Sequence, residues 1–307
     1  MRPALREIPT DLGGQARARL GRRLENFVQA ALWAAALGAL LTVLLQSLLA
    51  ADLRGGRLDV GLFESAWGSS VGRWQLVRLP LVAALAVILA GRVRTSALAD
   101  DKSRRSLWWF LWMFLSVALL GTNSMAGHAA SSSPLALTLI NDLVHLIAGA
   151  TWFTGVVVLA TVLPRGTSRM GSRERLQVGA PMISRFSDVA LASIAIVAGT
   201  GTFNSLVNVA RADDLIDSGY GRALAIKLLL FLGVLALGAT NHFFVRRRLE
   251  RSLIDAEATR MQAVFRRTIA IELALALGLM GVTGVLVGSE RTREQAVGSG
   301  ELTQSAL

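Results

Sequence analysis

The 307-residue sequence predicts an all-α fold, a polytopic membrane helix bundle of about seven transmembrane helices. Hydrophobic residues make up 53% of the chain, and they are gathered in long blocks instead of alternating with charge. Each block is about 20 residues long, which is the length that a helix needs to cross a hydrocarbon core of ~30 Å. This pattern excludes a pair of ordinary soluble domains, which the length alone would allow.

Seven apolar blocks are expected to form the transmembrane helices. The second block is the least regular, because Arg78 and Pro80 lie near its start. Proline is tolerated in the first turn of a helix, and an arginine near a helix end can extend its charge to the interface, so this block is retained as a span. The predicted spans are residues 27–51, 74–91, 107–126, 143–164, 189–210, 223–245 and 269–288.

The distribution of basic residues predicts the orientation of the bundle. Of the 32 Lys and Arg residues, 23 lie in the N-terminal segment and in the connections after the second, fourth and sixth blocks. The opposite side carries 7, and Arg78 and Lys227 lie within blocks. Because Lys and Arg are enriched in cytoplasmic loops, we expect the N-terminus in the cytoplasm and the C-terminus outside. The net charge of +11 therefore indicates topology and a lipid partner, with no nucleic acid expected.

Three segments are expected along the chain. Residues 1–26 form an Arg-rich cytoplasmic lead-in, residues 27–289 the transmembrane domain, and residues 290–307 a polar external tail. The sequence contains no cysteine, which excludes disulfides and thiolate metal sites. Any site for a soft metal ion must therefore use histidine and methionine.

Four side chains near the outer ends of the third and fourth spans predict a metal site. Met125 and His128 close the third span, and Asp142 and His145 open the fourth, each pair three residues apart. A short connection joins the spans, so the two pairs can face each other at one depth. Imidazole and thioether suit copper, and thioether favours Cu(I). Taken singly, His128 as a solvated helix end and Asp142 as a carboxylate favoured by the helix dipole are equally good interpretations.

A second polar group is predicted near the cytoplasmic surface. Asn241 and His242 end the sixth span, and Glu272 opens the seventh. An ionisable residue inside a span is costly unless it is paired or hydrated, so each is a candidate for function. Glu272 could form a structural ion pair with an arginine such as Arg185. Alternatively, the group could be an inner station for an ion that enters from outside, and the sequence permits both.

The run Gly127-His128-Ala129-Ala130, followed by Asp142 and His145 in an Asp-x-x-His pattern and then by Trp152, resembles the copper resistance protein D family. The resemblance continues in order through the chain and covers roughly residues 20–288. It implies a multi-pass protein of the bacterial cytoplasmic membrane that transports copper or confers copper resistance. A periplasmic copper-binding protein or a membrane complex is the partner that this resemblance implies.

One departure from the family pattern keeps other functions open. Members commonly carry an additional first helix, often preceded by a fused periplasmic copper-binding domain, and this sequence shows only a short polar lead-in instead. An accessory or assembly subunit of a larger membrane complex is therefore one alternative. A haem-binding electron carrier, with His128 and His145 as axial ligands, is another. An enzyme is not expected, because no nucleophile with a base and no carboxylate pair stands out.

Overall fold

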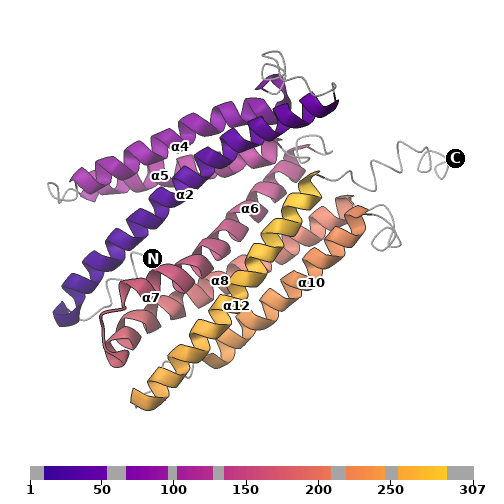
Figure 1. Ribbon diagram of the computed structural model, residues 1–307. Coiled ribbons are helices and arrows are strands. Elements are labelled where there is room, and N and C mark those ends of the chain that lie inside the picture. Colours follow the sequence, from indigo (N-terminus) through magenta and orange to yellow (C-terminus); the bar gives the residue numbers. More distant parts are fainter. Residues whose placement is uncertain are drawn as a thin grey trace. The chain divides into compact units, whose positions relative to one another are not determined.

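The protein is described here by a computed structural model, drawn as a ribbon in Figure 1. The structure describes residues 10–53, 67–95, 102–126, 135–208, 219–245 and 255–288. Within these ranges nearly every residue is helical and no strand occurs. The predicted all-α fold class is therefore confirmed.

The described ranges contain seven long helical segments, in the order that the apolar blocks predict. α6 continues without a break through the π-helical turn η2 into the short α7, and α10 continues into the π-helical turn η3. The bounds are α2 (Thr10–Leu53), α4 (Ser70–Thr95), α5 (Lys102–Ala126), α6 (Leu135–Val157), η2 (Val158–Val162), α7 (Leu163–Gly166), α8 (Ser172–Asn208), α10 (Gly219–Thr240), η3 (Asn241–Val245) and α12 (Asp255–Gly288).

Six of these segments are long and apolar enough, within the described ranges, to cross a membrane. They are Ala18–Leu48, Val71–Gly91, Ser106–Ala126, Ala136–Gly166, Gln177–Ser205 and Gly221–Phe243. α12 carries the seventh predicted span and is not among these six. Large apolar side chains stay exposed on the helices, for example Trp33 at 70% and Phe110 at 68%, as expected where lipid covers the surface.

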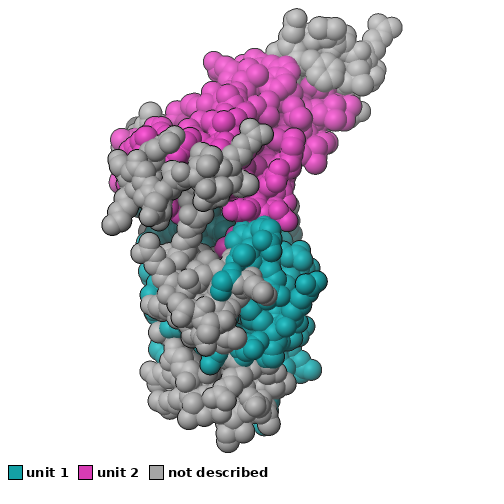
Figure 2. All heavy atoms as spheres, turned by 90° about the vertical axis from the view of Figure 1, so that its left-hand side faces the viewer, with its two compact units in different colours: residues 1–23, 144–307 teal, residues 24–143 magenta. Residues whose placement is uncertain are grey.

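The chain divides into two compact units, coloured separately in Figure 2. Unit 1 comprises residues 1–23 and 144–307, and unit 2 comprises residues 24–143. In unit 2, α2, α4 and α5 pack around a small buried cluster formed by Leu32, Val82 and Leu85. Apolar residues of α5, among them Trp112, pack against this cluster. Unit 2 is thus held together by a core that lies between its three long helices.

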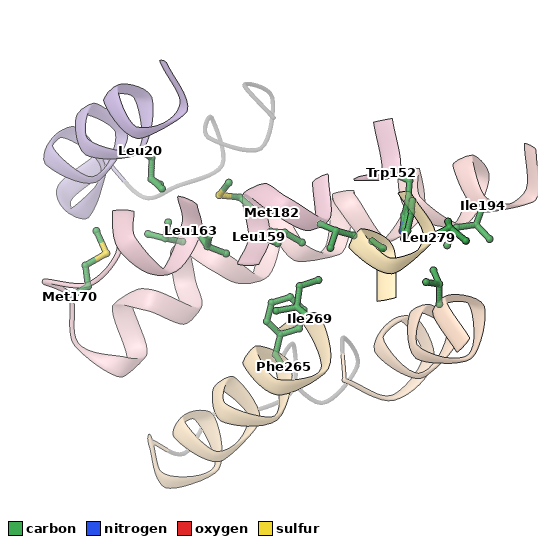
Figure 3. Close-up of a cluster of buried hydrophobic side chains, with 14 residues drawn as sticks. Leu20, Trp152, Leu159, Leu163, Met170, Met182, Ile194, Phe265, Ile269 and Leu279 are labelled. Atoms are coloured by element: carbon green, nitrogen blue, oxygen red, sulfur yellow. The ribbon is translucent and has the colours of Figure 1, made fainter. Parts of the chain in front are cut away.

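Unit 1 has the larger hydrophobic core, shown as sticks in Figure 3. Most of its buried members come from α6, η2, α7, α8, α10 and α12, and they include Trp152, Leu159, Val234 and Ala276. Leu20, from the first turns of α2, is completely buried in the same core. The Arg-rich lead-in expected at residues 1–26 is therefore helical from Thr10 onward, and one of its side chains packs in unit 1.

Gly155 allows α8 to pack directly against α6. A Cβ atom at this position would lie 1.8 Å from Cε2 and 2.4 Å from Cδ2 of Phe186 on α8. Because real Cβ atoms do not approach other atoms so closely, any side chain at residue 155 must displace the aromatic ring. The position of Phe186, and with it the separation of the two helices, therefore depends on this glycine.

Pro164 explains the first π-helical turn. Proline has no backbone N–H, and its ring clashes with the carbonyl group four residues earlier in a regular α-helix. The wider turn η2 ends two residues before Pro164 and contains Ala160, the residue four positions before the proline, so the helical segment can continue to Gly166. No proline lies in or directly after η3, so its cause must be sought elsewhere.

Candidate functional site

Unit 1 contains a small cavity that is lined by the predicted inner polar group. Its volume is about 60 Å³, which is room for a few water molecules or a dehydrated ion. The lining comes from α8, α10, η3, η2 and α12. Its polar members are Ser187, Asn241, His242 and Glu272, and the remainder is almost entirely apolar. The structure thus brings all three residues of the predicted inner station to one cavity.

Glu272 is the only charged side chain that is buried in the described part of the chain, with 3% of its surface exposed. One carboxylate oxygen accepts a hydrogen bond from Nε1 of Trp152 at 3.3 Å, and the other accepts one from Nδ2 of Asn241 at 3.1 Å. Both donors are neutral.

The π-helical turn η3 places Asn241 and His242 on the cavity wall. Nδ1 of His242 and Oγ of Ser187 on α8 are hydrogen-bonded at 2.7 Å, and the imidazole ring packs edge-on against Phe243. Oδ1 of Asn241 is buried without a hydrogen-bond partner. Buried acceptors are almost always paired, so this oxygen is available to accept a hydrogen bond or to ligate a cation. π-Helical turns are frequent at functional sites, and η3 fits that pattern.

The cavity therefore offers a carboxylate, an amide oxygen and an imidazole ring, which are ligand types for a metal cation. Within the described ranges, however, no three His, Asp or Glu side chains lie close enough together to hold a metal ion on their own. These few ligands suit transient binding of an ion better than permanent binding of a structural metal ion. A structural metal site uses a complete set of protein ligands.

His145 is the member of the predicted outer site that unit 1 contains. Its Nδ1 atom lies 2.8 Å from Oγ1 of Thr200 on α8, and the imidazole ring also lies next to Gly201. A Cβ atom at residue 201 would lie 3.5 Å from Cε1 of the histidine. The ring of His145 is therefore held against α8, two helical turns along α6 from Trp152.

The structure does not test whether the remaining residues of the outer site gather with His145. His128 lies outside the described residues, and Met125 and Asp142 belong to unit 2. Met125 ends α5 with 36% of its surface exposed, and Asp142 is half-buried on α6. The outer cluster of two histidines, a methionine and an aspartate stays a prediction.

Replacing Trp152 with Phe tests the hydrogen bond to Glu272. The variant keeps an aromatic ring in the core but loses the N–H donor, so one carboxylate oxygen loses its partner. We expect the free energy of unfolding to fall by about 1–3 kcal/mol, measured as a lower thermal midpoint in detergent. Trp112→Phe in unit 2 is the matched control, since Trp112 contributes packing to that core. Equal midpoint shifts in both variants would show that the hydrogen bond contributes nothing.

The six apolar helices define a polytopic membrane protein, and unit 1 of this protein contains a small cavity with a partly polar lining. Residues 180–286 match the model of the family described as Copper resistance protein D. This match covers most of α8 and all of α10 and η3, and nearly all of α12, which are the helices that line the cavity. The resemblance found in the sequence is confirmed over these residues.

Two curated relatives extend the similarity along the chain. The copper transport protein CutJ of Bacillus subtilis (strain 168) is 26% identical over 241 residues, which is 78% of this chain and 40% of the relative. The copper resistance protein D of Pseudomonas syringae pv. tomato is 26% identical over 221 residues, covering 68% of this chain and 61% of the relative. The chain thus spans about half the length of these relatives. No solved structure matches it. Together with the apolar helices, these relatives identify a multi-pass protein of the bacterial inner membrane.

Proposed function

We propose that this protein receives copper ions at the outer side of the cytoplasmic membrane and moves them toward the inside. The observation that carries the proposal is the cavity in the region that matches the copper resistance protein D family. Polar and ionisable groups are costly inside a membrane, and they mark the pathways of ions and protons. The two relatives are named for copper transport and copper resistance, which makes copper the ion to test first.

Copper would enter at the outer cluster and leave through the cavity. His128 and His145 supply imidazole, Met125 a thioether and Asp142 a carboxylate, and this set suits either oxidation state of copper. From His145, the helix α6 leads to Trp152, which bonds the carboxylate of Glu272. Asn241 and His242 then provide the last polar groups of the proposed path. Glu272 is therefore the first member of the inner station on the proposed path from the outer ligands.

The supplier and the driving force are part of the same proposal. A periplasmic copper-binding protein would deliver the ion. Because no nucleotide-binding motif is found in the sequence, the movement of copper would be passive, ion-coupled or driven by transfer to a partner. An accessory subunit that passes copper to a larger membrane complex is the second form of this function. Stoichiometric co-purification of another membrane protein would favour the accessory form.

Copper content tests the outer site. The purified protein, equilibrated with copper and passed through a desalting column, is expected to retain about one copper ion per chain by elemental analysis, as expected for a site with several protein ligands. The double variant His128→Ala, His145→Ala is expected to retain almost none. Equal copper content in both proteins would exclude these histidines as ligands. An absorption spectrum of the same samples separates the haem alternative, because a Soret band would appear only with haem.

A further inference from the structure

The first turns of α2 pack against the short helix α7 in unit 1. Leu20 is completely buried, and it belongs to the same hydrophobic cluster as Leu163 and Met170 (Figure 3). A Cβ atom at Gly166 would overlap Cδ2 of Leu20 and would lie 3.8 Å from its Cα atom. This close approach is possible because residue 166 has no side chain. Two segments that are far apart in the sequence therefore meet at Leu20 and Gly166.

Both of these segments are strongly basic. Residues 17–25 contain four arginines and one glutamate, and residues 165–175 also contain four arginines and one glutamate. The side chains of Arg22 and Arg23 on α2, of Arg165 on α7 and of Arg169 in the turn after α7 are exposed. These four side chains form the basic junction. Because like charges repel one another, the packing of α2 against α7 gathers positive charge at a cost in free energy.

Hydrogen bonds fix the turn after α7, which carries Arg169. Nε of Arg175 donates to the carbonyl oxygen of Met170 at 2.8 Å, and Nη2 of the same side chain donates to the carbonyl oxygen of Ser168 at 3.0 Å. One guanidinium group thus holds the two carbonyl groups that flank Arg169 in the chain. Arg169 is therefore presented to the surroundings on a turn of defined shape.

The basic junction lies at the ends of two apolar segments. Within the described ranges, the segment of α2 that can cross a membrane begins at Ala18, and the segment that includes α7 stops at Gly166. The ends of a membrane span lie at the border between the hydrocarbon core and the headgroup layer. An arginine at this level extends its guanidinium group toward the headgroups. Lipid headgroups are therefore the expected surroundings of the basic junction.

We propose that the basic junction binds the phosphate groups of anionic phospholipids, and that α2 and the α7 segment contribute to this binding together. A guanidinium group matches the geometry of phosphate with its planar fork of N–H donors. Each basic residue next to a membrane surface adds to the attraction of anionic lipids, and a zwitterionic lipid provides much less attraction. A bound anionic headgroup also lowers the repulsion between the two segments, so it favours the packing of Leu20 against Gly166.

Native mass spectrometry of the full chain in detergent with added phosphatidylglycerol tests the proposal. Phosphatidylcholine with the same acyl chains is the reference lipid, because it contains a phosphate group but has no net charge. We expect the wild type to retain phosphatidylglycerol in preference to phosphatidylcholine. Two double variants, Arg22→Gln with Arg23→Gln and Arg165→Gln with Arg169→Gln, each remove two exposed charges from one segment. In each double variant, the retention of phosphatidylglycerol should fall by about tenfold or more.

The double variant Arg266→Gln, Arg267→Gln is the matched control. These two arginines are exposed on α12, just before the predicted span 269–288, and they are not part of the basic junction. Retention of phosphatidylglycerol by this control should stay close to that of the wild type. An equal loss in all three double variants would overturn the proposal, because any pair of arginines at the membrane surface would then bind the lipid.

Two other results would also contradict a lipid site at the basic junction. One is equal retention of the two lipids by the wild type, and the other is unchanged retention of phosphatidylglycerol in either variant of the junction. Because the substituted side chains are exposed, we expect the variants to fold, and thermal unfolding of each checks this. If a double variant does not fold, the single variants Arg22→Gln and Arg169→Gln replace it, and unchanged retention in both would overturn the proposal.

Discussion

Replacing Glu272 with Gln is expected to slow the entry of copper about tenfold or more while the protein stays folded. The substitution removes the one buried carboxylate of the described structure and changes its shape very little. The new side chain can still accept the hydrogen bond from Trp152. Its amide can donate to Asn241 once that side chain turns its oxygen inward, which also provides a partner for the unpaired Oδ1 atom. Stability should therefore be close to that of the wild type.

The loss of charge has a different consequence for a passing cation. A carboxylate in a low-dielectric interior attracts a cation strongly, and an amide offers only a dipole, so the rate of copper entry should fall by about tenfold or more. Copper entry into proteoliposomes that contain a copper chelator measures this rate. Glu174→Gln, at the start of α8 and outside the cavity, is the control and should transport normally. Wild-type entry in the Glu272→Gln variant would remove this residue from the path.

A side chain at residue 155 is expected to cause the largest loss of stability among the variants considered. In Gly155→Val, the new Cβ atom would overlap the ring of Phe186, and the two added methyl groups leave the ring still less room. Overpacking of this kind costs about 1–3 kcal/mol, and the cost should be at the upper end here because α6 and α8 must separate. Thermal unfolding in detergent should show a clearly lower midpoint.

Gly149→Ala on the same helix is the control for the Gly155 variant. A Cβ atom at residue 149 would lie 4.0 Å from Cγ2 of Val197, which is an ordinary contact. Its thermal midpoint should therefore equal or exceed that of the wild type, since alanine favours a helix over glycine. If Gly155→Val unfolds at the same temperature as Gly149→Ala, then α6 and α8 do not pack as closely as the structure has them.

The apolar blocks predict the helices well because a membrane span must be both long and uniformly hydrophobic. They do not predict where a helix ends. α2 begins at Thr10 although the apolar block begins near residue 27, because hydropathy locates the part of a helix that lipid covers and the helix itself continues beyond it. The π-helical turns are also invisible in the apolar pattern. Pro164 gives a local reason for η2, whereas nothing in the sequence around Asn241 indicates η3.

The polar residues of the cavity could be predicted from the sequence only where they interrupt an apolar span. Asn241, His242 and Glu272 stand out because polar groups are rare within apolar spans, and the structure places all three at one cavity. The partner of Glu272 was not predictable. Trp152 lies 120 residues away in the chain, and in the sequence it stands out only as the residue that completes the pattern after Asp142 and His145. Only the folded arrangement pairs its N–H group with the carboxylate.

Arg78 shows the same limit in unit 2. The sequence explains this arginine as one that extends its charge to the interface from a helix end. It does not indicate that Thr122 and Asn123 accept hydrogen bonds from the guanidinium, or that Oε1 of Gln75 on the same helix is buried without a hydrogen-bond partner. These contacts depend on how α4 and α5 pack, and a hydropathy pattern contains no information on which faces of two helices meet.

The rate of copper entry into proteoliposomes tests the central claim most directly. Liposomes containing the wild-type protein and an internal copper chelator are mixed with copper outside, and internal copper is followed over time. We predict that copper enters faster than into liposomes without protein, and that the His128→Ala, His145→Ala variant abolishes the difference. Entry at the rate of protein-free liposomes would contradict the account of this protein as one that moves copper across the membrane.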